Sequence, residues 1–214
     1  MVEAGQLLGP RIYSTGPPIG ASMARAINSL DDARALLRRY SHYYRVAAIK
    51  QYSFGDRRRR QWLVMAAREQ SLMTFAEGNG ETKPGLTEII DGYTAHEHYF
   101  TMAPLYRDVI ALFGQSGMSY TPTLIVTHGA QGAEEFFYQT HDAHDDAKLR
   151  RFTPHPLLDR ETRRREQSWQ MWMHEEEYMF PRLAKTADDL LAAGAPIGVG
   201  GHGQRQGLGL HWEL

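Results

Sequence analysis

The chain of 214 residues contains no cysteine, which excludes a disulfide scaffold, a thiolate zinc site and a cysteine nucleophile. It also has no excess of charge, because 24 Lys and Arg stand against 25 Asp and Glu. A net charge of −1 gives no field that would attract nucleic acid or an anionic membrane. No apolar run approaches the roughly 20 residues of a membrane span. Residues 1–8 lack a basic residue before their apolar part, which argues against a signal peptide and leaves the localisation unknown.

What is present is typical of a globular protein, with 42% hydrophobic and 23% charged residues. The length favours one domain. Short apolar runs alternate with stretches of helical period, and we expect six strands, at 11–14, 46–52, 72–76, 93–100, 120–126 and 196–200. We expect helices at 30–43 (capped by Ser29), 56–69, 84–90 and 104–113, and a charged helical insertion at about 132–193.

Alternation of strands with helices favours a parallel sheet with helical crossovers, either doubly wound or a (β/α) barrel. A barrel of this type has eight strands and about 250 residues. If the chain forms a barrel, six strands make it a piece of one.

Two charged residues lie where ligands bind in such folds. Lys50 follows the apolar run 46–49 on the face of Val46 and Ala48, and it is either a lysine that reaches solvent at the sheet edge or a functional group. Burial would lower its pKa, and the neutral amine could take up carbon dioxide as a metal-binding carbamate. Glu77 follows the strand 72–76 in a glycine-containing loop, where it could be a metal ligand, a general base or a solvated carboxylate.

Histidines supply the other candidates. In an extended strand, His96 and His98 point to the same face, and two imidazoles on one face are a start for a divalent-metal site. His202 ends the last expected strand between glycines that let the backbone approach a ligand. Glu97 and His128 are further candidates.

Taken together, these residues resemble the amidohydrolase superfamily, and most closely its imidazolonepropionase-like branch, whose members often follow a TolB-like β-propeller. The stretches that carry the resemblance occur in the family's order: 9–16 (GPRIYSTG), 49–52 (IKQY), 76–78 (AEG), 90–98 (IDGYTAHEH), 120–124 (YTPTL) and 194–203 (GAPIGVGGHG). They cover nearly the whole chain outside the insertion.

The resemblance implies a (β/α)8 barrel with a metal centre at the carboxyl ends of its strands. Lys50 matches the fourth-strand lysine that many members carboxylate, and His98, preceded by Glu97, matches the sixth-strand ligand. Glu77 stands where many relatives have a fifth-strand histidine. His202 stands where the family usually has the eighth-strand aspartate, which binds metal and acts as general base. The implied metal ligands are therefore Lys50, Glu77, His98 and His202, with Glu77 and His202 also catalytic.

The family's first-strand H-x-H pair has no counterpart before Arg11. We therefore expect residues 1–214 to form a single partial domain, about strands 3 to 8 of the barrel. Because unpaired strand edges seek partners, we expect a homo-oligomer or a chain that lacks an N-terminal portion.

These expectations lead to a metal-dependent hydrolase that cleaves carbon–nitrogen bonds of an amide, a cyclic amide or a peptide-like substrate, with zinc as the expected divalent metal. The alternative is a non-catalytic amidohydrolase-like scaffold or subunit with a degenerate metal site. A doubly wound nucleotide-binding domain ranks last, because residues 15–18 (TGPP) are too rich in proline for a glycine-rich phosphate loop.

Overall fold

The computed structural model describes residues 2, 4–52, 55–78, 80–98, 100, 102–126, 136–137, 140–162, 174–203 and 207–214. The chain divides into two compact units. The first unit comprises Met1–Glu77 and Thr87–His96, and the second comprises Gly78–Leu86 and Glu97–Leu214.

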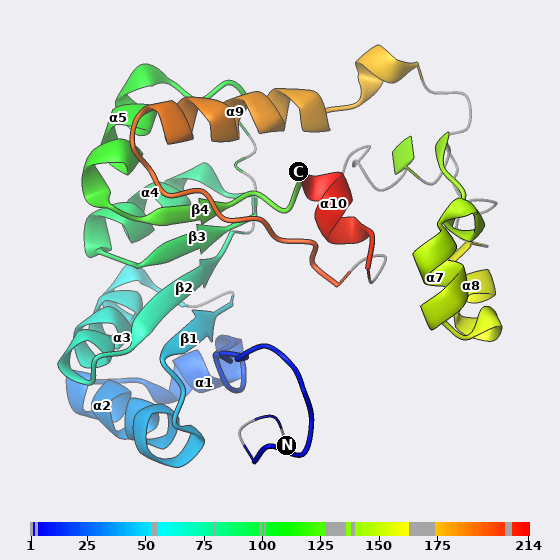
Figure 1. Ribbon diagram of the computed structural model, residues 1–214. Helices are drawn as coiled ribbons and strands as arrows, with labels where there is room; N and C mark the ends of the chain where they lie inside the picture. The colour runs from blue at the N-terminus through cyan, green and yellow to red at the C-terminus, as the bar shows by residue number, and fades with distance from the viewer. Residues whose placement is uncertain are drawn as a thin grey trace. The chain divides into compact units, whose positions relative to one another are not determined.

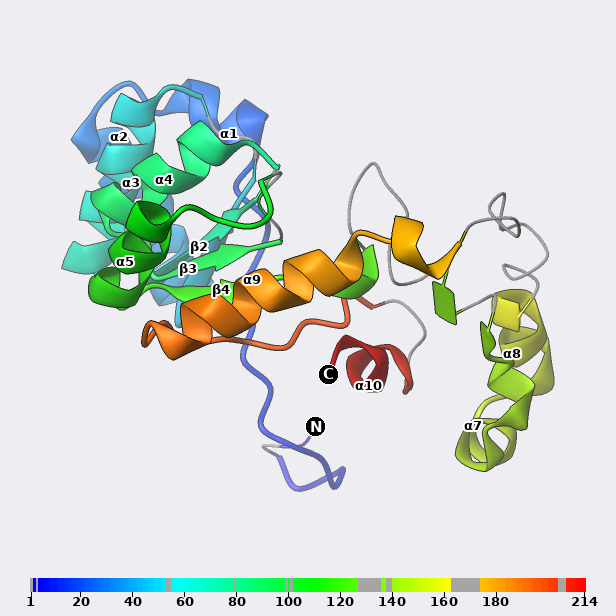
Figure 2. The same ribbon diagram turned by 90° about the horizontal axis from the view of Figure 1, so that it is seen from above.

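The first unit is built on two parallel strands, β1 (Ala48–Gln51) and β2 (Met73–Glu77), in which Ile49 pairs with Thr74. Its helices are α1 (Ala21–Ala26), α2 (Leu30–Arg38) with the π-helix η1 (Arg39–Tyr44), and α3 (Arg57–Glu69). In both views α2 and α3 lie on the same side of β1 and β2 (Figures 1 and 2). Their apolar faces bury a common core that includes Leu37, Ile49 and Leu63.

Local capping explains where these helices begin. The Ser29 hydroxyl accepts a hydrogen bond from the N–H of Asp32 at 3.1 Å, and the Asp56 carboxylate accepts one from the N–H of Arg59 at 3.0 Å. Such caps satisfy backbone donors that the first helical turn leaves without a partner. The helices predicted at 30–43 and 56–69 are thereby confirmed.

Strand β3 (Ala95–Glu97) follows α4 (Thr82–Asp91), and β4 (Ser119–Thr121) follows α5 (Arg107–Ser116). The four strands form one parallel sheet in the order β1-β2-β3-β4, and the division between the units falls within β3. Each crossover in the described sheet contains a helix, as expected for parallel strands. This α/β architecture is compatible with part of a (β/α)8 barrel.

In the second unit, α9 (Phe180–Ala192) lies beside α5 (Figures 1 and 2). The rings of Phe100, Phe113 and Tyr120 pack against one another with centroids 5.7–5.9 Å apart. The remaining helices are short: η2 (Leu124–Val126), η3 (Ala143–Asp145), α7 (Ala147–Phe152), α8 (His155–Thr162), η5 (Glu175–Glu177) and α10 (Gly209–Glu213). The predicted insertion is thus helical but broken in its described part, as its prolines require.

Four of the six predicted strands differ from the structure. The strands predicted at 93–100 and 120–126 are shorter, as β3 and β4, and residues 124–126 form the 3-10 helix η2 instead. Residues 11–14 do not form a strand, and Ile12 and Tyr13 are 81% and 72% exposed. The chain first joins the sheet at Ile19, which forms a parallel bridge with Gln51. Residues 196–200 contribute only the bridge between Ile197 and Tyr120. Runs of four or five residues are too short for their pattern to fix whether a strand finds a partner.

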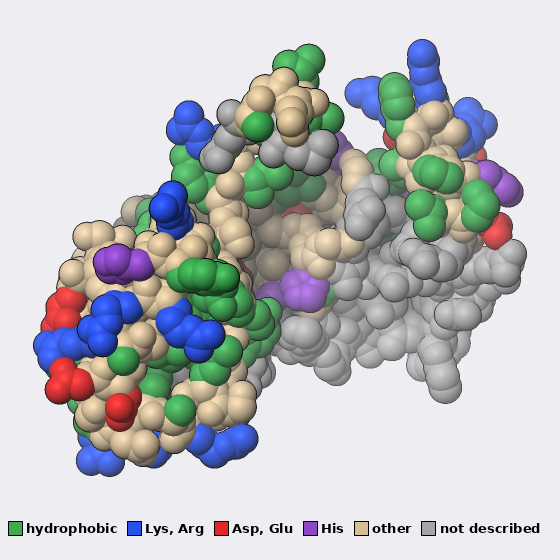
Figure 3. Space-filling model, turned by 90° about the horizontal axis from the view of Figure 1, so that it is seen from below, with side chains coloured by type: hydrophobic (Ala, Val, Ile, Leu, Met, Phe, Trp, Pro, Cys, Tyr) green, Lys and Arg blue, Asp and Glu red, His purple; other side chains and the backbone are tan. Residues whose placement is uncertain are grey.

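Within the described part of the chain, every helix falls short of the length and apolar character that a membrane span requires. On the face drawn in Figure 3, basic and acidic side chains both occur among the described residues, as the balanced composition leads one to expect.

We predict that Gly114→Ala destabilises the second unit. A Cβ atom at this position of α5 would lie 2.3 Å from the carbonyl oxygen of Ala193. The helices would have to move apart, which typically costs about 1–3 kcal/mol. Urea denaturation should show this loss, whereas Gln115→Ala, an exposed neighbour on α5, should change the free energy of unfolding little. A Gly114→Ala variant stabilised by about 1 kcal/mol, as helix propensity alone predicts, would contradict the close packing.

Candidate functional site

The first unit brings Lys50 and Glu77 together at the carboxyl ends of β1 and β2. Lys50 lies opposite Phe75 in the strand register, and alternation places Glu77 on the same face as Phe75. The Nζ atom of Lys50 lies 2.7 Å from an Oε atom of Glu77. Both side chains are about nine-tenths buried, with 10% and 11% of their surface exposed. Lys50 lies within β1, and Glu77 is the last residue of β2 rather than part of the loop in which it was predicted.

Burial governs the electrostatics of this pair. It lowers the pKa of the Lys50 ammonium, while the hydrogen bond and the attraction to Glu77 act in the opposite direction. The ring of Tyr52 lies 5.6 Å from Nζ of Lys50. Burial and the charge of Glu77 together raise the pKa of the Tyr52 hydroxyl. The ammonium of Lys50 therefore loses its proton more readily than that of a lysine in water.

His96 occupies a different environment from the one that the sequence predicts. Its Nδ1 atom lies 3.2 Å from a carboxylate oxygen of Glu88 in α4, and the two side chains are 2% and 4% exposed. The prediction that His96 and His98 extend from one face of a continuous strand is wrong, because β3 ends at Glu97. His96 thus belongs to a buried pair with a helix.

His98 leaves the strand direction through a left-handed backbone, with φ of 70°. Its N–H donates to the carbonyl oxygen of Thr121 at 2.7 Å, and its Nδ1 atom lies 2.5 Å from the hydroxyl of Thr123. In a regular strand Glu97 and His98 would point to opposite faces. After the turn, their ligand atoms lie within 4.8 Å of each other.

The extended segment 196–200 runs along β4 and brings His202 close to His98. The N–H of Tyr120 donates to the carbonyl oxygen of Pro196 at 2.9 Å. The N–H of Gly198 donates to the carbonyl oxygen of Tyr120 at 2.8 Å. A Cβ atom on Gly200 would lie 2.7 Å from a methyl group of Thr121, so a larger residue would displace this segment. The imidazole rings of His98 and His202 then lie 5.2 Å apart, tilted by 67°. His202 also has a left-handed backbone, with φ of 48°.

Two residues of this region were missed by the sequence analysis. Thr123 touches His98 and is 5% exposed, and the buried carboxylate of Glu213 binds the backbone that follows Thr123. Thr123 lies in the stretch 120–124 that carries the family resemblance, which was a usable signal. No local pattern marks Glu213, because its partners lie 88 and 89 residues away.

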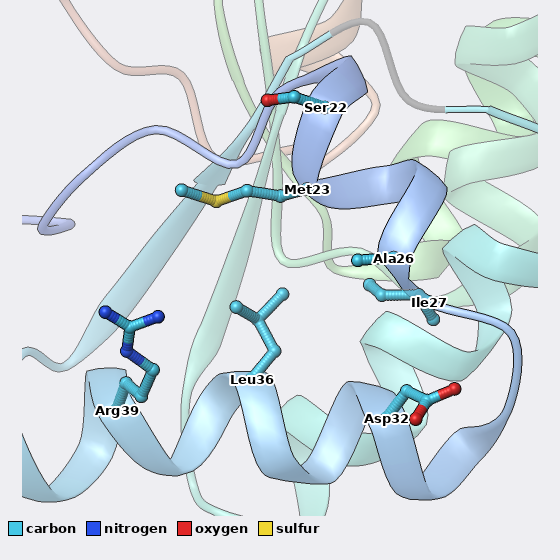
Figure 4. Close-up of a pocket in the computed structure, with 7 residues that line it drawn as sticks. All are labelled: Ser22, Met23, Ala26, Ile27, Asp32, Leu36 and Arg39. Atoms are coloured by element: carbon cyan, nitrogen blue, oxygen red, sulfur yellow. The ribbon is translucent and has the colours of Figure 1, made fainter.

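The other candidates lie elsewhere. His128 falls outside the described residues. The first unit also has a surface cavity of about 330 Å³ between α1 and α2, where Met23 and Leu36 form apolar walls and Asp32 and Arg39 add charge (Figure 4). Among the described residues, the predicted site candidates lie outside the lining of this cavity.

Comparisons with known proteins bear on the fold. No protein-family model matches the chain, and no curated protein does. The solved structure of bottromycin amidohydrolase is similar, with a TM-score of 0.61 and 13% sequence identity. The similarity covers 93% of this chain but 48% of that protein, so the chain spans about half its length. The chain therefore shares the fold of part of an amidohydrolase, and this likeness gives no support to the imidazolonepropionase-like branch.

We predict that Glu77→Gln lowers the pKa of Lys50 further. The substitution removes the negative charge that stabilises the ammonium, while the burial that destabilises it remains. An NMR titration of the Lys50 side chain should place its deprotonation at lower pH than in the parent. Glu69→Gln is the control, because it makes the same charge change in a pair with Arg34 at the surface. An unchanged or raised Lys50 pKa in Glu77→Gln would refute the coupling.

Proposed function

We propose that the chain carries part of the catalytic centre of a metal-dependent hydrolase that cleaves carbon–nitrogen bonds of amides. The observation that carries the proposal is the convergence of His98 and His202, with Glu97 beside His98, after strands of a fold shared with an amidohydrolase. Left-handed backbone at both histidines adds support, because strained conformations in residues other than glycine cluster at functional sites.

The residue types fit a divalent cation. Glu97 and His98 of the second unit have ligand atoms within 4.8 Å of each other, and Glu77 is the last residue of β2 in the first unit. Zinc accepts this combination of oxygen and nitrogen ligands, which does not require cysteine. Glu77 directly precedes Gly78, whose N–H donates to the carbonyl oxygen of Glu97 at 2.8 Å. We propose zinc as the metal that Glu77, Glu97, His98 and His202 hold.

Each side chain has a role in this proposal. A divalent metal, when bound, supplies a water of lowered pKa and polarises the carbonyl group of the bond to be cleaved. Glu77 and Glu97 provide negative charge to retain the cation, and His98 provides a nitrogen held in place through Thr123. His202 is exposed, and its imidazole can accept a proton from water and return it to a leaving amine.

Carboxylation of Lys50 is a separate part of the proposal and depends on the metal. In the structure Lys50 forms an ion pair with Glu77. A carbamate would replace this attraction with repulsion between two anions in a buried place, where charge pairs interact strongly. A cation between them would remove the repulsion. We therefore propose that Lys50 is an ammonium without metal and that it becomes carboxylated only together with metal binding.

The substrate that we propose is a small amide, a cyclic amide or a dipeptide-like molecule. The structural neighbour is named bottromycin amidohydrolase. Only the general chemistry, hydrolysis of an amide bond, is taken from it for this chain.

Elemental analysis of the purified chain, followed by titration with zinc after chelation, tests the proposal. We expect near-stoichiometric zinc, and we expect His98→Ala and Glu97→Gln each to weaken binding by about 10- to 100-fold or more, since even residues that only orient ligands have effects of this size. His202→Asp should retain zinc, because a carboxylate is also a zinc ligand.

His42→Ala is the matched control, because His42 lies in η1 and its ring contacts Ser41. Its zinc affinity should equal that of the parent. A folded chain that binds neither zinc nor manganese would exclude the hydrolase and favour the non-catalytic scaffold.

A further inference from the structure

A buried carboxylate in α10 holds the loop that follows β4. Glu213 is 8% exposed, and its two oxygens accept hydrogen bonds from the N–H groups of Leu124 and Ile125 at 2.7 and 2.9 Å. These donors begin the short helix η2, where no preceding helical carbonyl is available to them. Glu213 therefore caps η2 from a segment that is distant in sequence.

The capped turn begins at a residue in an unfavourable conformation. Thr123 has φ of 48°, which is a costly left-handed conformation for a β-branched residue. Such conformations cost about 1–3 kcal/mol and persist only where surrounding contacts enforce them. The Glu213 bonds fix the two residues after Thr123, and the N–H of Val126 donates to the Thr123 carbonyl oxygen at 3.1 Å. The conformation of Thr123 is thus held from its C-terminal side.

The hydrogen bonds of the Thr123 hydroxyl bear on which nitrogen of His98 carries the proton. The hydroxyl donates to the carbonyl oxygen of Pro122 at 2.8 Å. Because a hydroxyl has one proton, its oxygen acts as the acceptor in the 2.5 Å contact with Nδ1 of His98. Nδ1 of the neutral ring therefore carries the hydrogen, and Nε2 carries the lone pair. A second hydrogen-bond partner commonly sets the tautomer of a histidine ligand in this way.

We propose that Glu213 is a positioning residue, which holds Thr123 through the backbone of η2 and so fixes His98 in the Nδ1–H tautomer with Nε2 presented as the acceptor. The proposal deepens the proposed function, since it concerns the same His98. It does not depend on metal, because the contacts are all present in the chain itself.

The test measures the tautomer of His98 by long-range proton–nitrogen NMR of the metal-free chain at a pH where the ring is neutral. In the parent we expect the Nδ1–H form. Thr123→Val is close in shape and removes the acceptor, so we expect a mixture of tautomers. Glu213→Gln replaces one acceptor oxygen with a donor group that faces backbone donors, and we expect the same change in His98. Glu176→Gln, an exposed residue of η5, is the matched control and should leave His98 as in the parent.

Glu213→Asp keeps the negative charge on a shorter side chain. The tautomer of His98 can be measured in this variant if Glu213→Gln does not fold. We expect it to retain more of the Nδ1–H form than Glu213→Gln, and less than the parent. Folded Glu213 variants with the parent's tautomer would overturn the role of Glu213. A Thr123→Val variant with the parent's tautomer would overturn the link through Thr123.

Zinc titration separates this proposal from the proposed function. If the parent binds zinc, Glu213→Gln should weaken binding by about 10- to 100-fold, the effect typical of residues that orient ligands. If the parent binds no metal, the proposed function fails, and the NMR result alone decides the role of Glu213.

Discussion

The N–H of His98 donates to the carbonyl oxygen of Thr121 at 2.7 Å, and the candidate site of the second unit depends on this bond. It fastens the chain to the end of β4 at the point where the backbone of His98 turns left-handed. Consecutive side chains of a strand point to opposite faces, so an extended chain would separate the ligand atoms of Glu97 and His98. The turn instead directs the His98 ring toward Thr123 and His202. A strained backbone at this position thus converts the end of a strand into a cluster of polar groups.

Two buried pairs of ionisable side chains in the described part of the first unit differ in position. Lys50 and Glu77 meet at the carboxyl ends of parallel strands, whereas His96 pairs with Glu88 of the helix α4. Removing charges from water costs several kcal/mol per ion, so such pairs are weak evidence of a stabilising role. Burial at strand ends, with a lowered lysine pKa, is typical of functional sites. By this argument the Lys50–Glu77 pair is a functional candidate and the His96–Glu88 pair is part of the interior that joins β3 to a helix.

The sequence predicts those parts of the structure that local forces decide. Helices α2 and α3 begin at Ser29 and Asp56 because these side chains cap the backbone donors that follow them. Contacts between distant segments decide the rest. Residues 11–14 have a strand-like pattern but no partner strand, and the turn at His98 requires the carbonyl oxygen of Thr121. The role proposed for Glu213 requires donors about ninety residues earlier in the chain, which no local pattern reveals. The candidate histidines were found because imidazole chemistry is specific to residue type, whereas their orientation depends on tertiary contacts.

Two residue types differ from those usual in the amidohydrolase superfamily that the sequence resembles, and this changes where negative charge lies. Glu77 stands where many relatives have a histidine, and His202 stands where the family usually has an aspartate. The carboxylate of Glu77 lies 2.7 Å from the ammonium of Lys50, so its negative charge is compensated by a neighbouring strand. His202 is exposed and lies beside His98. The exchange therefore places the carboxylate in a buried, paired position and the imidazole where water reaches it. A histidine in that place has access to solvent that the buried Glu77 carboxylate lacks.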